Sequence, residues 1–215
     1  MIERSPFFNF VTYLAMAIGA FLVVIPFWIT LVAGSQSLQE VSRVPINLWP
    51  SSHLWENLQV AWERADLGPK MINSFIVAIG VTLGKITLAS LSAFAIVFFN
   101  FRGRMISFWL IFITLMLPVE VRIGPTYEVV SNLGMLNSYA GLTVPLIASA
   151  TATFLFRQFF LTVPDELVEA ARMDGAGPMR FFIDILLPLT RTSIAALFVI
   201  QFIYGCNQYL WPLLV

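Results

Sequence analysis

The sequence predicts an all-α protein that crosses a membrane several times, and its composition and its long apolar runs are the observations that predict it. Of its 215 residues, 59% are hydrophobic and 11% are charged, and the mean hydropathy is +0.84. Soluble domains carry roughly 25% charged residues. A helix needs about 20 apolar residues to cross a bilayer, and several runs approach or exceed that length. The formal net charge is zero, which gives no basis for nucleic-acid binding.

Five apolar segments are predicted to span the membrane within a single domain over residues 1–215. The first is longer than the ~7–15-residue core of a signal peptide and lacks a small-residue cleavage site, so an uncleaved span is expected. Pro26 is expected to kink it. The five predicted spans are 10–32, 74–98, 105–119, 139–160 and 193–215.

The polar segment 34–72 is predicted to contain a helix lying in the membrane interface, where tryptophan is enriched. Its apolar face comprises Leu54, Trp55, Leu58, Ala61, Trp62 and Ala65. His53 stands alone in this segment, and Cys206 is the only cysteine of the chain. A lone loop histidine is more often exposed than a metal ligand, and one cysteine excludes an internal disulfide. No metal or cofactor is therefore expected.

The second span combines closely spaced glycines with a lysine. Gly80 and Gly84 have the small-xxx-small spacing that lets helices approach closely in lipid. The run from Gly80 to Ile86 imitates a phosphate-binding loop, but it is one residue too short between its glycines and ends in isoleucine where a hydroxyl should hold magnesium. No nucleotide site is predicted. Lys85 lies mid-span, where a lysine costs about 2.5–3.5 kcal/mol, so it should face protein or water, either as a structural partner or in a transport pathway.

A charged segment, 162–188, separates the last two spans and is predicted to form two short helices joined by a glycine turn. Thr162 and Asp165 have capping-box spacing, with Pro164 in the first turn. Gly175 can take the positive φ that ends a helix. A second amphipathic stretch then runs to Pro188, and its apolar face is Met179, Phe182, Ile183 and Leu186.

The order of residues in this segment resembles the cytoplasmic EAA loop of binding-protein-dependent ATP-binding-cassette importers. The matching positions are Glu169, Ala170, Ala171, Gly175, Ile185, Leu187 and Pro188, and Asp174 and Ala176 add the Asp-Gly-Ala form of the carbohydrate-uptake branch. In that family the loop forms coupling helices that dock into a cleft of the ATPase subunit, and the two small alanines would let its surface approach closely. The alternative is a solvated connector without a partner. A motif of this specificity in a membrane protein disfavours that alternative.

Basic residues predict the orientation of the chain. One side carries Arg4, Arg102, Arg104, Arg157, Arg172, Arg180 and Arg191, and the other carries Arg43, Arg64, Lys70 and Arg122 over longer loops. The positive-inside rule places the N-terminus and the Glu169 segment in the cytoplasm. We therefore expect a multi-pass protein of the bacterial inner membrane, with its coupling segment on the side where an ATPase would be.

Further matches extend the resemblance along the chain, at Asn73-Ser74, at the turn from Phe101 to Arg104 and at 207–213. Glu120 and Arg122 depart from the mostly apolar residues of many sugar permeases. Together with the runs 115–118 and 151–157, they look most like one of the two permease subunits of sn-glycerol-3-phosphate importers. The candidate substrate-pathway residues are Arg122, Glu120, Lys85, Asn207 and Gln208. Arg122 suits a phosphate because its guanidinium can bind bidentately; alternatively it pairs with Glu120 or anchors the helix end.

The resemblance implies a type I importer permease fold of six spans. A sixth span is then missing from these 215 residues, either because the sequence is cut short or because the protein lacks it. The implied partners are a second permease subunit, two ATPase subunits and a periplasmic substrate-binding protein, and the chain itself is expected to be a transport subunit and not an enzyme. Glu169 would contact the ATPase, Gly175 would set the angle between the coupling helices, and Pro188 would mark where the coupling segment ends and the chain continues to the last span.

Other function classes remain as alternatives. The chain could carry another sugar or polyol, or be a truncated membrane protein that does not transport. A membrane-embedded enzyme would need converging carboxylates or histidines in its spans, where the sequence offers one lysine. A secondary transporter would place more ionisable or broken-helix features at mid-membrane, and would leave the Glu169 segment unexplained.

Overall fold

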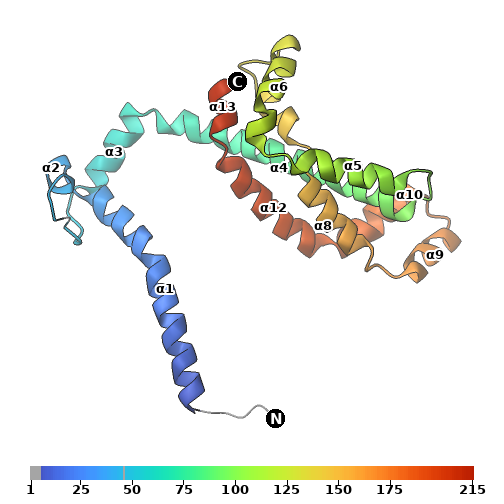
Figure 1. The fold of residues 1–215 in the computed structure, drawn as a ribbon, viewed down its shortest axis with the longest axis horizontal. Coiled ribbons are helices and arrows are strands. Elements are labelled where there is room, and N and C mark those ends of the chain that lie inside the picture. Colours follow the sequence, from blue (N-terminus) through green and yellow to red (C-terminus); the bar gives the residue numbers. More distant parts are fainter. Residues whose placement is uncertain (1–5, 46) are drawn as a thin grey trace. The chain divides into compact units, whose positions relative to one another are not determined.

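The computed structural model describes residues 6–45 and 47–215, except for the side chains of 114–116, 119 and 120, and every regular element it describes is a helix (Figure 1). The chain, predicted as one domain, divides into two compact units, Met1–Lys70 and Met71–Val215. The first unit contains α1 (Pro6–Ser35), α2 (Leu38–Val41) and α3 (Leu54–Arg64). Helix α4 (Leu67–Phe98) begins at its end and continues through the second unit.

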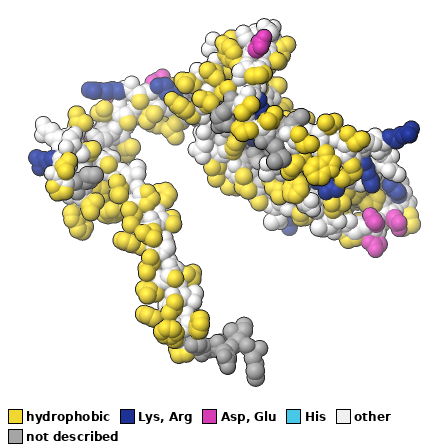
Figure 2. All heavy atoms as spheres, viewed as in Figure 1, with side chains coloured by type: hydrophobic (Ala, Val, Ile, Leu, Met, Phe, Trp, Pro, Cys, Tyr) yellow, Lys and Arg dark blue, Asp and Glu magenta, His cyan; other side chains and the backbone are white. Residues whose placement is uncertain are grey.

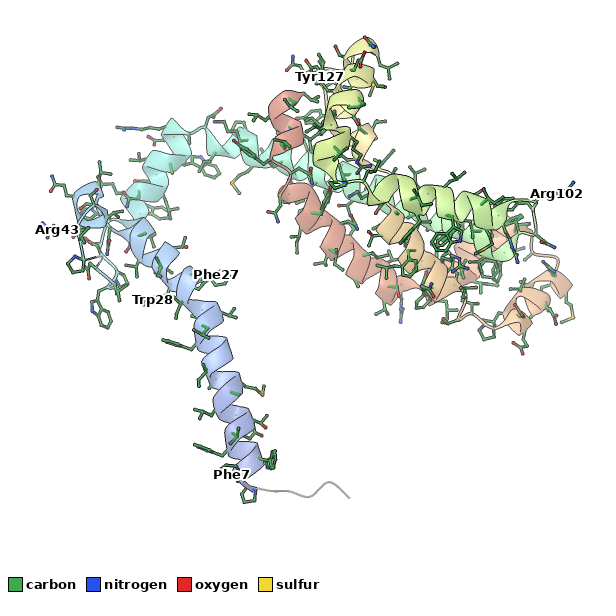
Figure 3. All side chains as sticks on the ribbon, in the orientation of Figure 1. Phe7, Phe27, Trp28, Arg43, Arg102 and Tyr127 are labelled. Carbon is green, nitrogen blue, oxygen red and sulfur yellow. The ribbon has the colours of Figure 1, made fainter. Side chains whose placement is uncertain are left out.

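Helix α1 is apolar on all sides, and most of its length makes few contacts with the rest of the protein. Its apolar stretch is 6% buried, and Phe7, Phe27 and Trp28 project outward from it (Figure 3). A helix that is hydrophobic all round is stable in lipid rather than in water. The predicted span 10–32 lies within this helix.

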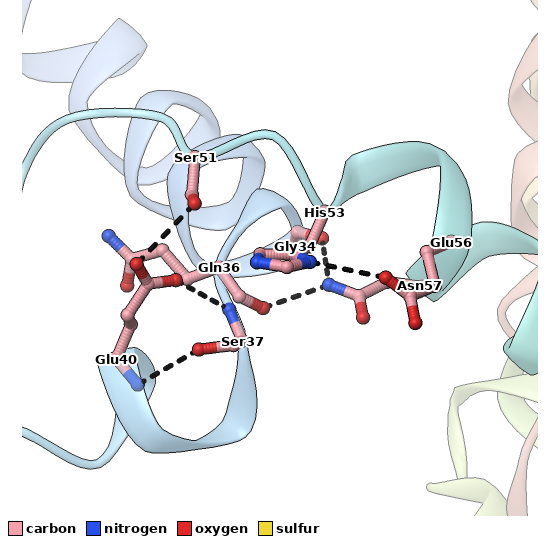
Figure 4. A network of polar contacts seen from close by, with 8 residues as sticks. All are labelled: Gly34, Gln36, Ser37, Glu40, Ser51, His53, Glu56 and Asn57. Atoms are coloured by element: carbon pink, nitrogen blue, oxygen red, sulfur yellow. Dashed lines mark hydrogen bonds and ion pairs between the residues drawn. The ribbon is translucent and has the colours of Figure 1, made fainter.

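The C-terminal end of α1 is joined to α3 by a network of polar contacts (Figure 4). The Asn57 side-chain amide donates to the carbonyl oxygens of Gly34 and Gln36, both at 2.9 Å. The Ser37 hydroxyl and the Glu40 carboxylate form a capping box at the start of α2. These bonds satisfy backbone groups that the turn after α1 would otherwise leave unpaired. The apolar face predicted for α3 is exposed, at Trp55 and Trp62 among others.

The second unit is built around α4, which packs against α8 and α12. Its other elements are α5 (Arg104–Met116), α6 (Val119–Asn132), α7 (Tyr139–Thr143), η1 (Val144–Leu146), α8 (Ala150–Phe160), α9 (Asp165–Met173), α10 (Pro178–Phe181), η2 (Phe182–Leu186), α11 (Leu187–Leu189), α12 (Arg191–Cys206) and α13 (Leu210–Leu214). Along α4 the buried residues recur every four positions: Val77, Val81, Lys85, Ala89 and Ala93. Val77 and Val81 belong to one apolar cluster, with Trp211, and Ala89 and Ala93 belong to another. Lys85 therefore lies on the buried stripe between the two clusters.

Glycines bring neighbouring helices close to α4, as the sequence predicted for Gly80 and Gly84. A Cβ on Gly84 would lie 2.8 Å from the Cβ of Ile147, and one on Gly80 would lie 3.1 Å from Thr143 Cγ2. On α12, a Cβ on Gly205 would lie 2.9 Å from the Cα of Ala78. A side chain on Gly84 or Gly205 would force its neighbour to move, and one on Gly80 would require Thr143 to shift by a few tenths of an ångström, so close packing here depends on glycine.

Three of the described helical segments are long and apolar enough to cross a membrane: Pro6–Ser35, Leu67–Phe98 and Arg191–Leu214. The predicted span 139–160 is a broken helix, in which Tyr139–Leu146 and Ala150–Phe160 meet at 49°. Helix α5 has 13 residues, fewer than the ~20 that cross a bilayer unaided, because the chain becomes extended at Leu117 before Pro118. The five predicted spans thus correspond to three long helices, one broken pair and one short helix.

Candidate functional site

The coupling segment begins differently from the prediction. Helix α9 starts at Asp165 with Pro164 as its N-cap, and no side chain caps it. The hydroxyl of Thr162 donates to the carbonyl of Phe159 at 2.7 Å, so the predicted capping box with Asp165 is wrong. Thr162 instead closes the end of α8, a local bond that competes with capping the next helix. Asp165 and Glu166 still lie in the first turn of α9, where the helix dipole favours carboxylates.

Gly175 ends α9 as predicted, with φ of +74°. The N–H of Gly175 donates to Arg172 at 3.0 Å, and the N–H of Ala176 donates to Ala171 at 2.9 Å. This pair of bonds is a Schellman motif, which satisfies carbonyls at a helix end and turns the chain sharply. The angle at which the chain leaves α9 is therefore fixed by backbone hydrogen bonds.

The two alanines of the motif have different environments. Ala171 is 4% exposed and packs into this chain's own apolar cluster, with Phe94, Phe160 and Leu186. Ala170 is exposed on the other side of α9. Of the two, only Ala170 is open to another protein.

The acidic residues of α9 are also open to a partner. Glu169 is exposed, as are Asp165, Glu166 and Asp174, and Figure 2 shows acidic side chains (magenta) gathered over this helix. A cavity of about 150 Å³ lies beneath α9, lined by aromatic residues of α4 and α10 together with Ala171 and Arg172. The segment thus presents a carboxylate-rich outer face and rests its inner face on the core.

The second half of the segment has a different buried face from the predicted one. Phe182 and Leu186 are buried as expected, but Met179 and Ile183 are 53% and 55% exposed, and Phe181 is buried in their place. Residues Phe182–Leu186 form a π-helical turn, which adds a residue to the turn and rotates the residues after it. Of the remaining motif positions, Ile185 and Leu187 are half-buried against the core, and Pro188 is exposed in the first turn of α11.

A second site is a polar cavity of about 430 Å³ in the membrane-spanning part of the second unit. It brings together two predicted residues, Lys85 of α4 and Arg122 of α6. The rest of its lining is Leu117, Pro118, Ala148, Ser149, Ala150, Thr151, Ile200, Gln201 and Tyr204. None of these described lining residues is acidic.

Lys85 is held by two residues of α12. It is 6% exposed, its ammonium donates to the Gln201 amide oxygen at 3.0 Å, and its nitrogen lies 3.7 Å from the centre of the Tyr204 ring. Such a cation–π contact partly compensates a desolvated charge. Lys85 is thus paired within the protein and also lines a cavity, and its role in a transport pathway stays a prediction.

The other predicted pathway residues lie elsewhere. Asn207 is exposed at the C-terminal end of α12, and the half-buried Gln208 donates to the Tyr204 carbonyl at 3.4 Å. Neither lines the polar cavity. The side chain of Glu120 lies outside the described residues.

Sequence reasoning missed Gln201 and Tyr204, which lie more than a hundred positions from their partner in the chain. The available signal was that Gln201 is a polar residue inside an apolar span, and such residues are usually functional or paired. The first turn of α8 was also not predicted to belong to the site.

Comparisons with known proteins give a consistent result. Residues 85–215 match the family described as binding-protein-dependent transport system inner membrane component. The chain is 57% identical to the sn-glycerol-3-phosphate transport system permease protein UgpE of Escherichia coli O6:K15:H31 (strain 536). It is 55% identical to the protein of that name from Yersinia enterocolitica serotype O:8. Each alignment covers 100% of this chain and 79% of the relative.

A solved structure resembles the whole described fold. The crystal structure of a bacterial ABC transporter involved in the import of the acidic polysaccharide alginate matches 98% of this chain and 75% of its own, with a TM-score of 0.75. The two sequences are 22% identical, so this likeness establishes the fold alone.

Proposed function

We propose, since the chain belongs to the family of binding-protein-dependent transport system inner membrane components, that it forms the translocation pathway for sn-glycerol-3-phosphate in an ATP-binding-cassette importer. The chain is a transport permease of the inner membrane with several spans. The substrate is proposed because permease subunits named for sn-glycerol-3-phosphate resemble this chain along its entire length. The cavity with Lys85 and Arg122 supports an anionic substrate.

The complete importer, in this proposal, pairs the chain with a second permease subunit, two ATPase subunits and a periplasmic binding protein. The ATPases supply the hydrolysis, and the chain contributes none. Helix α9 docks on one ATPase subunit through its outer face, where Glu169 and Ala170 are exposed. A carboxylate there can form a charge-assisted hydrogen bond, and a small residue beside it permits close approach.

Coupling requires that α9 be packed firmly enough against the membrane-spanning helices for its movement to move them as well. The buried face of α9 supports this, because Ala171 packs in one cluster with residues of α4, α8 and α12. The Schellman motif at Gly175 and the buried Phe181 and Phe182 tie the second half of the segment to the same cluster. Closure of the ATPases on ATP would then move the packed helices together and switch the cavity between its inward-facing and outward-facing states.

The orientation that this mechanism needs agrees with the distribution of basic residues. Helix α9 must lie in the cytoplasm with the ATPases, and the positive-inside rule predicts that location for it and for the N-terminus. The polar network between α1 and α3 then lies on the periplasmic side, where the binding protein delivers its substrate.

Reconstitution of the complete importer in proteoliposomes tests the proposal. Radiolabelled sn-glycerol-3-phosphate should enter the vesicles only when ATP and the loaded binding protein are both present, and removing the ATPase subunits should abolish uptake. Entry of a neutral sugar or polyol without entry of sn-glycerol-3-phosphate would refute the substrate. Uptake that continues without the ATPases would refute the coupling mechanism.

A further inference from the structure

Among the residues that the structure describes, the lining of the polar cavity carries two positive charges and no negative one. Lys85 and Arg122 both line it, and the described part of its lining contains no carboxylate. The ion pairs of the described residues are His53–Glu56 and Arg180–Asp184, so neither cation of the cavity has an acidic partner among them. A buried charge is costly unless it is paired. The cavity is therefore suited to an anion that would complete the pairing.

The broken helix adds a third positive element to the same cavity. The chain is non-helical at Ala148 and Ser149, and α8 then begins at Ala150. The Ser149 hydroxyl accepts the N–H of Ala152 at 3.2 Å. The N–H groups of Ala150 and Thr151 have no partner within the helix, and both residues line the cavity. Helix N-termini favour anions because these N–H groups and the helix dipole act together.

The contacts of Lys85 fix the position of its ammonium group and leave some of its N–H donors free to bind a ligand. An ammonium group has three N–H donors, and the described bond to Gln201 uses one of them. The Tyr204 ring offers its face to the cation without accepting a conventional hydrogen bond. Arg122 adds a planar fork that can bind two oxygens of one phosphate. Together these groups can donate to several oxygens of a single anion.

We infer that this cavity holds the phosphate group of the substrate within the membrane, between Lys85, Arg122 and the first turn of α8. The inference rests on the proposed function and assigns the substrate's charged group to a site. A phosphate monoester carries between one and two negative charges near neutral pH, which the two cations balance. The volume of about 430 Å³ lies within the range of about 300–1,000 Å³ of small-molecule sites, which leaves room for a glycerol moiety.

The test is direct binding of radiolabelled sn-glycerol-3-phosphate to the complete permease–ATPase complex in nanodiscs. A non-hydrolysable ATP analogue holds the complex in its ATP-bound state, and the binding protein is omitted because it would bind the label itself. Arg122→Gln and Lys85→Met each remove a charge-assisted bond and should weaken binding about 10- to 100-fold. Arg122→Lys should weaken binding less than Arg122→Gln, since it retains the charge and loses the fork. Excess unlabelled inorganic phosphate should compete with the label, and glycerol should not.

Thr151→Asp separates recognition from folding. A carboxylate in the first turn of α8 favours the helix through its dipole, so the fold should be retained or slightly stabilised. The same carboxylate lines the cavity and repels a phosphate, so binding should fall at least tenfold. Thr151→Asn, which has the same shape without the charge, is the matched control. Arg102→Gln removes an arginine that projects away from the helices (Figure 3) and should bind like the wild type.

Uptake in proteoliposomes separates this inference from the proposed function. One result would overturn the cavity as the phosphate site and leave the importer proposal standing. In that result the wild-type complex takes up the substrate, and Thr151→Asp and Arg122→Gln bind and transport it like the wild type. Absence of sn-glycerol-3-phosphate uptake by the wild type would overturn both. If the site is correct, these variants should assemble normally with the ATPase, while sn-glycerol-3-phosphate uptake falls roughly tenfold, as expected when a charge-assisted bond to the phosphate is lost or opposed.

Discussion

Substitution of Gly175 tests whether the angle between the two halves of the coupling segment transmits movement. The residue has φ of +74°, and a Cβ added there would meet nothing within 4 Å. The effect of a side chain is therefore purely conformational, without a clash. Residues with a Cβ lose about 1–2 kcal/mol in the left-handed region, asparagine loses less, and a β-branched residue loses the most.

The structure gives two routes by which Gly175→Val can relax, and both have similar cost. The valine can remain at positive φ, at about 2–3 kcal/mol. The turn can instead open and lose the bonds from Gly175 to Arg172 and from Ala176 to Ala171, at about 0.5–1.5 kcal/mol each. A cost of about 2 kcal/mol lowers the population of the native turn about 30-fold relative to its alternatives. Coupling should therefore decline in the order Gly, Asn, Ala, Val.

The assay is ATP turnover stimulated by the loaded binding protein, measured with substrate uptake in the reconstituted importer. Gly177→Val is the matched control, because Gly177 lies two residues away, is equally open, and has φ of −71° and ψ of 165°, which a β-branched residue adopts readily. All variants should reach the membrane in normal amounts. Wild-type transport by Gly175→Val, or equal loss in Gly177→Val, would refute the coupling role of the turn.

Three further changes test other parts of the structure. Ala170→Trp should leave the fold intact, because the position is exposed, but should abolish co-purification with the ATPase; retention of the ATPase would contradict the docking face. Gly84→Leu should lower the melting temperature through overpacking of about 1–3 kcal/mol against Ile147, and Ile147→Ala should restore part of it; an unchanged melting temperature would contradict the close contact. Hydrogen bonds from Ser37 lower the pKa of Glu40 below its ordinary value of 4.5, so the stability it gives α2 is present above that pH and lost as pH falls through the lowered pKa. Amide exchange of 38–41 should therefore accelerate in acid, and Glu40→Gln, which can still cap, should remove that pH dependence.

The coupling segment was predictable from the sequence where local chemistry decides the structure. Gly175 ends α9 because glycine alone takes positive φ without strain, and the spacing of the motif identified the family. The buried face of the following stretch was predicted only in part. A π-helical turn breaks the regular period at Phe182–Leu186, and before that turn the packing of Phe181 on the core, rather than any local signal, decides which side is buried. Thr162 was misassigned for a related reason. Its hydroxyl donates to the carbonyl of Phe159 at the end of α8, and the sequence does not rank that bond against capping the next helix.

The polar cavity was predictable only in part. A lysine in an apolar span must face protein or water, and Lys85 does, but its partner Gln201 is distant in the chain and is brought near by the packing of Gly205 on Ala78. That contact depends on tertiary structure. The expectation that Arg122 belongs to the pathway remains a prediction, and its position beside Lys85 in one cavity is what gives it a specific chemical role.

The broken helix is the feature that changes the interpretation most. Broken helices were expected of secondary transporters, yet this chain has one and belongs to an importer family driven by ATP, so the feature alone does not distinguish the classes. Its sequence signals were present, since Pro145 follows the short α7 and Ser149 is a strong N-cap before α8. Unwound backbone within a membrane is tolerated where it lines a cavity, and here it does. A helix N-terminus at that depth supplies positive potential without another buried cation, which would cost about 2.5–3.5 kcal/mol on insertion scales. In the proposed site, the break therefore adds the positive potential of a helix N-terminus to that of the two cations.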